Sequence, residues 1–483
     1  MTQSKITMSV MPQEEPNLVL VNREFDDFWD NKALSFTVTK YTKILSYVQK
    51  LPLVDPLAFL QKFTTEETVS FYWENPNKKE SIVACGITKK SLIKSEARFE
   101  ETQNFIDSCF KQIISKGEVA LSGSSPRIFC SFSFFSENSG NDQDFSPATV
   151  FLPRFQLIKK NKKCLLLVNY PLHEPQDESR IISQLHYKIT ATDWQQQENL
   201  VIDDQAKSSW EKKNVFAPED AQYFRNVVGS ALESIATNEF SKVVIAQATD
   251  ITSVTPFNII QSLHNLRKSH PDCYIFAIAN GQGKNFIGAS PERLVSIQNR
   301  QLVTDALAGS APRGKTNAED VHWSNLLLRS RKEKREHQAV SDFLLDRLRQ
   351  IGLKPYQLPL QLLRLSNIQH LWTPIYAHLP EDIEPLDIVA QLHPTPAVAG
   401  VETEIACEKI RHYENFDRSL YAAPLGWVDN QGNSEFVVGI RSALIEGKKA
   451  RLYAGAGIVS GSNPDKEFIE IQLKLQSLLK NLV

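Results

Sequence analysis

Residues 273–297 read CYIFAIANGQGKNFIGASPERLVSI, and this stretch decides the fold class. Segments 273–279 and 285–297 are apolar and rich in aromatic and β-branched residues, which predicts strands. The loop Gly281-Gln282-Gly283 resembles the start of a dinucleotide-binding fingerprint, but position 286 is Phe286 and the loop leads into a strand instead of a helix. Strands that follow one another in this way favour large antiparallel sheets flanked by helices.

The rest of the chain continues the pattern. Strands are predicted at 68–74, 81–85, 128–135, 151–158, 164–169, 242–249, 436–445 and 451–456, and helices at 218–235, at 318–350 and from Pro464 onward. The polar segment 194–214 is the best candidate for a linker. We therefore predict a β-rich half, residues 1–214, that completes the fold. Residues 215–483 hold 15 of the 19 glycines and, with them, the expected site.

Composition excludes several classes of protein. The 483 residues are 42% apolar and 23% charged, with a net charge of -2, which argues against a nucleic-acid binder. No apolar run is long enough for a membrane-spanning helix, and residues 1–16 lack the apolar core of a signal peptide. The six scattered cysteines form neither a disulfide framework nor a zinc motif. We predict a cytoplasmic protein without a nucleic-acid or membrane partner.

Two predicted helices each carry a pair of carboxylates. Glu333 and Glu336 are three residues apart on one helix, and Glu467 and Glu470 are three apart on the last helix, with Lys474 a turn later. Two such pairs facing each other could hold an oxygen-preferring cation such as Mg²⁺. Taken alone, the spacing is more typical of solvated helix faces with a Glu470–Lys474 salt bridge.

Lys242 and Glu292 are two further candidates for chemistry. A lysine at a strand start can act as a base if it points into an enclosed site, and a buried carboxyl at a turn can act as an acid. Each is more often an ordinary surface charge. The small-residue loops 307–314 and 453–459 leave room for backbone N–H groups to contact an anion, or they are simply tight turns.

Taken together, the motifs are far more specific. In order along the chain they are Lys-Val-Val-Ile-Ala (242–246), Gly-Ala-Ser-Pro-Glu (288–292), Leu-Ala-Gly-Ser-Ala-Pro-Arg-Gly (307–314), Glu-His (336–337), Leu-His-Pro-Thr-Pro-Ala-Val (392–398), Ala-Gly-Ala-Gly-Ile-Val (454–459) and Glu467-x-x-Glu470-x-x-x-Lys474. Over residues 218–480 this set resembles the chorismate-utilising enzymes, most closely the isochorismate synthases. The resemblance implies one large α/β (α+β) domain of two stacked, mostly antiparallel sheets with helices outside, and makes residues 215–483 the chorismate-binding catalytic region.

The resemblance also implies residue roles. Lys242 matches the base that activates water for attack at ring C2, and Glu292 matches the acid that protonates the departing C4 hydroxyl. Glu336 and Glu470 match the principal Mg²⁺ ligands, with Glu333 and Glu467 as nearby or water-mediated partners. The residues expected to contact the substrate are Gly309, Ser310, His370, Tyr421, Arg441, Gly455, Gly457 and Lys474, of which Tyr421 and Arg441 match the pair that holds the enolpyruvyl carboxylate.

Three positions bear on the choice within the family. Lys242 differs from the ammonia-using anthranilate synthases, and Ala308 stands where aminodeoxychorismate synthases typically carry lysine, so both favour water as the nucleophile. Gln247 departs from the arginine usual in this strand, which puts the local electrostatics in doubt. We predict an isochorismate synthase of the menaquinone or phylloquinone type.

Three alternatives remain. A salicylate synthase would share the Lys/Glu pair and then eliminate pyruvate. A non-catalytic chorismate-binding relative would have lost the base, the acid or the metal carboxylates. An amidotransferase subunit would need a glutaminase partner. We expect chorismate as the substrate and a monomer without an obligatory glutaminase.

Overall fold

The structure is a computed structural model that describes residues 25–29, 42–137, 145–172, 174, 177–194, 218–365 and 368–483. The predicted linker at 194–214, and with it the expected boundary near residue 214, falls almost wholly outside these ranges. No helix of the described part has both the length and the apolar character needed to cross a membrane.

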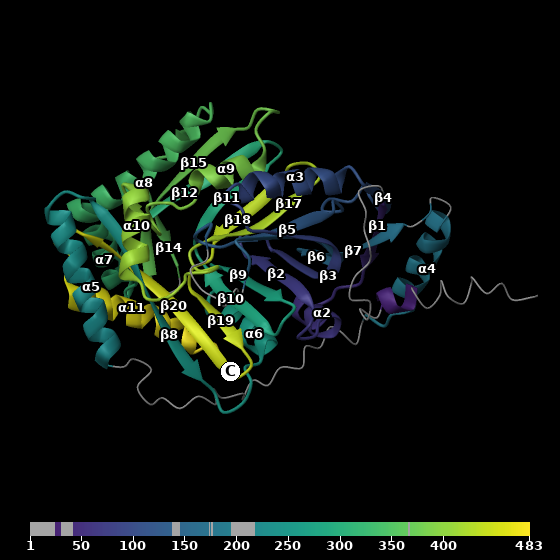
Figure 1. The fold of residues 1–483 in the computed structure, drawn as a ribbon, viewed down its shortest axis with the longest axis horizontal. Coiled ribbons are helices and arrows are strands. Elements are labelled where there is room, and N and C mark those ends of the chain that lie inside the picture. The colour runs from purple at the N-terminus through teal and green to yellow at the C-terminus, as the bar shows by residue number, and fades with distance from the viewer. Residues whose placement is uncertain are drawn as a thin grey trace, which may run out of the picture.

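The described strands form one hydrogen-bonded network that folds into two stacked layers (Figure 1). The first layer, in spatial order, consists of β3 (Glu80–Ile93), β2 (Val69–Asn75), β9 (Tyr274–Asn280), β10 (Lys284–Ser290), β19 (Ser442–Glu446), β20 (Lys449–Val459), β8 (Lys242–Thr252) and β16 (Gly400–Val401). The second consists of β5 (Arg127–Phe132), β17 (Pro424–Asp429), β18 (Ser434–Val438), β11 (Arg293–Gln298), β12 (Gln301–Pro312) and β15 (Ile368–His378), with β13 (Tyr356–Gln357) and β14 (Gln361–Arg364) both paired to β15.

One long strand, β6 (Ala148–Lys160), joins the two layers. It pairs with β3 along one edge and with β5 and β7 (Lys163–Leu172) along the other. β1 (Lys43–Leu51) follows β7, and the β1 pairing with β4 (Ile113–Gly117) is the one parallel ladder among the described strands. Strands from the two halves of the chain are therefore joined within both layers, because β2 pairs with β9 and β5 pairs with β17.

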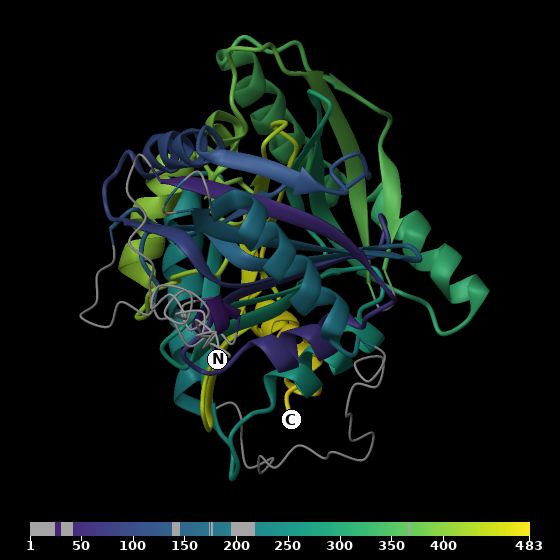
Figure 2. The same cartoon turned by 90° about the vertical axis from the view of Figure 1, so that its right-hand side faces the viewer.

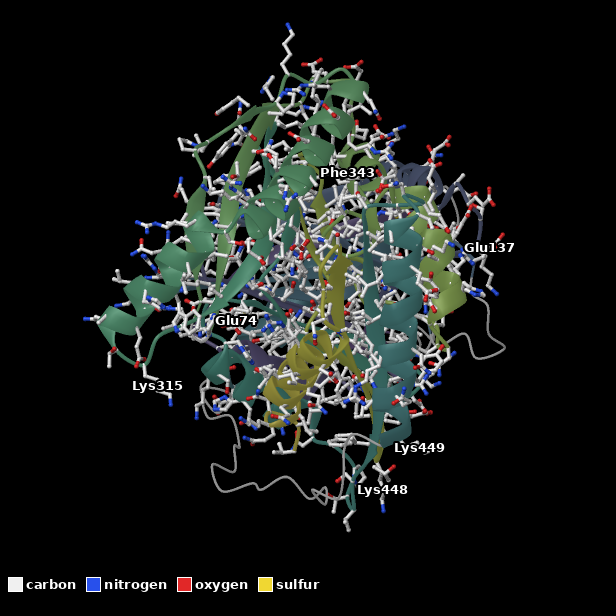
Figure 3. All side chains as sticks on the ribbon, turned by 90° about the vertical axis from the view of Figure 1, so that its left-hand side faces the viewer. Glu74, Glu137, Lys315, Phe343, Lys448 and Lys449 are labelled. Atoms are coloured by element: carbon white, nitrogen blue, oxygen red, sulfur yellow. The ribbon has the colours of Figure 1, made fainter. Side chains whose placement is uncertain are left out.

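The core lies between the layers. Phe71 of β2 and Phe129 of β5 pack with their ring centroids 5.1 Å apart. At the same depth, Asn75 and Tyr274 of the first layer donate hydrogen bonds of 2.9 and 3.2 Å to Glu435 of the second, which is fully buried. Charged side chains such as Lys449 project from the periphery instead (Figure 3).

Helices cover the outside of the layers (Figure 2). On the first layer pack α5 (Pro218–Ala236), α6 (Ile259–Ser269), α10 (Thr403–Tyr413) and α11 (Pro464–Leu479); on the second pack α7 (Asn317–Arg329), α8 (Arg331–Gln350) and α9 (Pro385–Leu392); and α2 (Pro56–Phe63), α3 (Arg98–Phe110) and α4 (Glu178–Ala191) pack near β6 and β1. The predicted fold class is confirmed.

Three predicted elements are interrupted. The strand expected over 285–297 ends at Ser290 and resumes at Arg293 in the other layer, and the strand expected over 436–445 is broken at 439–441 in the same way. The helix expected over 318–350 is two helices, because Ser330 is extended and its hydroxyl caps α8 by accepting a 3.3 Å hydrogen bond from the Glu333 N–H. The pattern of apolar residues continues on both sides of each break, so the sequence alone does not predict the breaks.

The β9–β10 hairpin shows why the opening stretch folds as it does. Gly281 and Gly283 have φ of +75° and +80°, which suits glycine at a tight turn. Gly288 lies opposite Phe276, and a Cβ at Gly288 would come within 2.5 Å of that ring. Gly281 and Gly283 therefore form the turn of the hairpin, and Gly288 allows it to pack against Phe276, in agreement with a strand instead of a dinucleotide-binding helix after this loop.

Candidate active site

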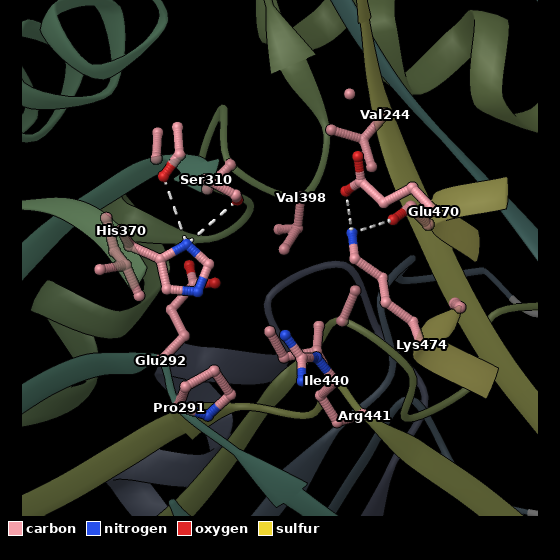
Figure 4. A pocket seen from close by; sticks show the side chains of 18 of the residues that line it. Val244, Pro291, Glu292, Ser310, His370, Val398, Ile440, Arg441, Glu470 and Lys474 are labelled. Atoms are coloured by element: carbon pink, nitrogen blue, oxygen red, sulfur yellow. Dashed lines mark hydrogen bonds and ion pairs between the residues drawn. The ribbon is translucent and has the colours of Figure 1, made fainter. Parts of the chain in front are cut away.

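Two crossings between the layers lie side by side and carry two of the predicted site residues. Glu292 occupies the crossing from β10 to β11, and Arg441 the crossing from β18 to β19. Backbone hydrogen bonds join the crossings: the Ala289 N–H donates to the Arg441 carbonyl at 3.1 Å, and the Val438 N–H donates to the Glu292 carbonyl at 3.1 Å. Both side chains line one cavity between the layers (Figure 4).

Burial controls the protonation of Glu292. Its carboxyl is 8% exposed, and burial, reinforced by Asp305 and opposed by Lys242, raises its pKa to about 7. At neutral pH a large fraction of Glu292 therefore keeps its proton. A protonated carboxyl facing an enclosed cavity can serve as a general acid.

Arg441 supplies positive charge to the cavity. Its backbone lies in the left-handed region, with φ of +53°, which is unusual for a residue other than glycine and is found where surrounding contacts fix the chain. Among the described residues no carboxylate pairs with its guanidinium. The planar fork is thus available for a bidentate bond to a ligand carboxylate.

Lys242 and Glu336 form a buried ion pair at another wall. Lys242 begins β8, Glu336 lies on α8, and the Lys242 ammonium donates to Glu336 Oε1 at 2.7 Å. Burial alone would raise the pKa of Glu336, but the charge and hydrogen bond of Lys242 outweigh it and hold the pKa below its ordinary value. Gly457 of β20 makes room for the pair, since a Cβ there would lie 3.0 Å from Lys242 Cε.

A second lysine–carboxylate pair comes from α11. The Lys474 ammonium lies 2.7 Å from Glu470 Oε1, and it also donates to the Gly455 carbonyl of β20 at 2.8 Å. Tyr421 lies beside them, because a Cβ on Gly455 would be 3.0 Å from the Tyr421 hydroxyl. The Glu470–Lys474 salt bridge that the helical spacing suggests is therefore present, but both of its residues line the cavity.

His370 and the loop after Ala308 complete the cavity. His370 Nδ1 lies 3.1 Å from the Ser310 hydroxyl and 3.3 Å from the Gly309 carbonyl (Figure 4). Burial, together with Arg441 and Lys474, lowers the pKa of His370 to about 3, so the imidazole is neutral at physiological pH. Its Nε2 is buried and has no hydrogen-bond partner in the described structure, which leaves it for a ligand.

Ten predicted catalytic and substrate-contacting residues line this one cavity, together with Glu336 and Glu470. Glu333 and Glu467 are not among the residues that line the cavity: Glu333 accepts a 3.3 Å hydrogen bond from the Ser310 N–H, and Glu467 is 9% exposed. Ten further residues that line the cavity have no role predicted from the sequence: Val244, Pro291, Leu307, Ala308, Ala397, Val398, Ala422, Ile440, Tyr453 and Ala454. Most belong to the motifs quoted above; Ala422 and Ile440 had no signal beyond adjacency to Tyr421 and Arg441.

The candidate metal site consists of four glutamates: Glu333, Glu336, Glu467 and Glu470. Within the described ranges, no three acidic, histidine or cysteine side chains form a ready-made metal cage. The donor set nevertheless fits a hard cation. Burial raises the pKa of Glu333, and Glu336 on its own helix and Glu470 on α11 raise it further; burial and Glu470 likewise raise the pKa of Glu467, so the carboxylates lie close enough to disfavour one another's charge. A divalent cation would relieve that repulsion, and carboxylate oxygens are its preferred ligands.

Comparison with known proteins identifies the class. Residues 31–483 match the family described as chorismate binding enzyme, so the chain belongs to the chorismate-binding enzymes. It is 31% identical over 456 residues to isochorismate synthase MenF of Bacillus subtilis (strain 168), covering 91% of this chain and 93% of the relative. It is 30% identical over 439 residues to the salicylate biosynthesis isochorismate synthase of Pseudomonas aeruginosa, covering 89% and 88%.

Solved structures agree on the fold. The chain resembles MenF, the menaquinone-specific isochorismate synthase from Escherichia coli, with a TM-score of 0.74 and 27% identity, over 95% of this chain and 99% of that one. Anthranilate synthase component I from Streptococcus pneumoniae shares the fold with a TM-score of 0.63 at 18% identity, over 92% and 94%.

Proposed function

We propose that this chain is an isochorismate synthase, which converts chorismate to isochorismate by adding a water-derived hydroxyl group at ring C2 as the hydroxyl group at C4 leaves. The observation that carries the proposal is that Lys242 and Glu292 line one cavity, with Glu292 holding a proton near neutral pH and with Arg441, which pairs with no carboxylate of the described residues, in the same lining. Similarity to isochorismate synthases over nearly the whole chain supports it.

The reaction requires a base and an acid on one substrate. Lys242, once deprotonated, takes a proton from water as the water oxygen bonds to C2. The ring double bonds shift, the C4–O bond breaks, and Glu292 donates its proton so that the hydroxyl leaves as water. Water is thus consumed and released, and the product is an isomer. Each proton transfer is worth about 10²–10⁴-fold in rate.

The remaining lining residues hold a dianionic substrate. We propose that Arg441 and Tyr421 bind the enolpyruvyl carboxylate, that Gly455 and Gly457 allow close approach of the backbone, and that Gly309, Ser310, His370 and Lys474 contact the ring region. Glu336 and Glu470 would hold Mg²⁺, with Glu333 and Glu467 supporting them, and the metal would supply positive charge to the second carboxylate.

The cellular setting is also a proposal. We propose a single-chain cytoplasmic enzyme that needs no glutaminase and whose product feeds menaquinone or phylloquinone synthesis. Its similarity to a menaquinone-specific enzyme supports the pathway. The six free cysteines, five of them buried, suit a reducing compartment.

The test is to incubate purified protein with chorismate, with and without Mg²⁺ and with added chelator, and to separate the products by chromatography. We expect isochorismate alone, lost on chelation. Salicylate with pyruvate would instead identify a salicylate synthase. Absence of turnover, including in a parallel reaction with ammonium, would identify a binding protein and refute the proposal.

A further inference from the structure

Among the described strands, none pairs continuously with the edge of β8 that lies beside the cavity. Along its other edge β8 pairs with β20 over its whole length, whereas β16 reaches only Lys242 and Val243. The backbone groups of Val244 and Ala246 on this edge therefore need other partners. The Val244 N–H finds one in the Ala399 carbonyl, at 2.8 Å.

A buried Arg418–Glu414 pair provides the rest. Arg418 Nη2 donates to the Val244 carbonyl at 2.9 Å, and Glu414 Oε1 accepts from the Ala246 N–H at 2.8 Å. The two side chains bind each other through Arg418 Nε and Glu414 Oε2 at 2.8 Å, and Arg418 is 1% exposed. Together they take the place of the missing strand.

Arg418 also reaches two other walls of the cavity. Its Nη1 donates to the Val398 carbonyl at 2.8 Å, and its own carbonyl accepts from the Tyr421 N–H at 2.7 Å. Val244, Val398 and Tyr421 all line the cavity, on three different segments of the chain. The Arg418 side chain is therefore bonded to two walls, at Val398 and Val244, and its backbone is bonded to the third, at Tyr421.

We propose that Arg418, held by Glu414, is a positioning residue whose side chain fixes the spacing of the Val244 and Val398 walls and thereby sets the affinity for the substrate; this rests on the proposed function. The reacting groups are held by other contacts. Lys242 is held by Glu336 and by pairing with β16 and β20, and Glu292 by the crossing at Val438. Loss of the Arg418 bonds should therefore affect substrate binding more than the chemical step.

The test is Arg418→Lys, which keeps the charge but loses the planar fork that reaches Glu414 and both carbonyls. We expect the KM for chorismate to rise by roughly tenfold and kcat to change by less than about threefold. Wild-type protein is run in the same assay. If wild-type protein shows no turnover, the proposed function fails, and the affinities of wild type and variant for chorismate by calorimetry then decide the positioning role.

Arg127→Lys is the matched control. Arg127 is also a buried arginine, 5% exposed and bound to Glu80 at 2.9 Å, but it lines a different cavity. The Arg127→Lys variant should have a lower melting temperature and an unchanged KM for chorismate. Glu414→Gln, nearly isosteric, carries the test if Arg418→Lys does not fold, and should raise KM by a smaller factor. A wild-type KM in the folded Arg418 or Glu414 variant, or a fall in kcat alone, would overturn the proposal.

Discussion

Lys242 and Glu292 reach the cavity from different elements and have different surroundings: Lys242 begins β8, and Glu292 lies on the crossing from β10 to β11. Lys242 is held by the carboxylate of Glu336, whereas Glu292 has burial and Asp305 acting to retain its proton. A base and an acid on one substrate are what a hydroxyl transfer requires.

Removal of either group should therefore abolish most of the activity. We expect Lys242→Ala and Glu292→Gln each to lower kcat by at least about 10²-fold, because each removes one proton transfer. Steady-state turnover of chorismate is the measurement. Lys449→Ala, an exposed lysine on β20, is the control and should keep wild-type turnover. A variant at Lys242 or Glu292 with near-normal kcat would remove that residue from the mechanism.

The raised pKa of Glu292 predicts a pH dependence. As pH rises through about 7, the acid loses its proton, so kcat/KM should fall on the alkaline side with an apparent pKa in this region. The free energy of unfolding should also fall as pH rises from the ordinary carboxyl range to about 7. The reason is that Glu292 binds its proton more tightly in the native state than in the unfolded chain. Chemical denaturation of wild type and Glu292→Gln checks this, and the variant should lack that part of the slope. A kcat/KM that stays level to pH 9 would contradict the assigned acid.

At the scale of the elements, β20 places Gly455 against Tyr421 and Gly457 against Lys242 and Glu336. A Cβ at Gly457 would lie 3.0 Å from Lys242 Cε and 3.4 Å from Glu336 Oε1. β20 therefore needs a residue without a side chain at position 457, where it contacts Lys242.

We expect Gly457→Ala to lower kcat by roughly tenfold or more, since it displaces Lys242, while the melting temperature changes little. The matched control is Gly229→Ala on α5, where a Cβ meets nothing within 4 Å and activity should stay unchanged. Equal activity of both variants would show that Lys242 tolerates displacement.

Elements also show what sequence patterns could and could not predict. The strands on either side of Glu292 were predicted, but the change of layer at Pro291 was not, because apolar residues continue on both sides of it. Helical spacing groups Glu333 and Glu467 with Glu336 and Glu470, but only Glu336 and Glu470 line the cavity, because spacing does not tell which carboxylates face it. Arg418 had no signal at all: its importance depends on an unpaired strand edge that exists only in three dimensions.

At the scale of the whole molecule, the two halves of the chain cannot be separated without opening the sheets. β9 depends on β2 and β17 depends on β5, so each half would expose strand edges alone.

A fragment of residues 218–483, although it holds every predicted site residue, should therefore fail to fold. We expect it to lack a cooperative thermal transition by circular dichroism and to aggregate, whereas the full chain unfolds cooperatively. Co-expression with residues 1–217 should restore soluble protein. A folded, chorismate-binding fragment would refute this interdependence and show the first half to be dispensable.

The position of β20 has a consequence for the synthesis of the protein. β20 lies between β8 and β19, and only α11 follows it along the chain among the described elements. During translation, β8 must wait through some two hundred residues for this partner, and the walls of the cavity remain apart until then. A ribosome that stalls before the codons of β20 therefore carries a chain that already holds Lys242 and Glu292 but has no closed pocket around them.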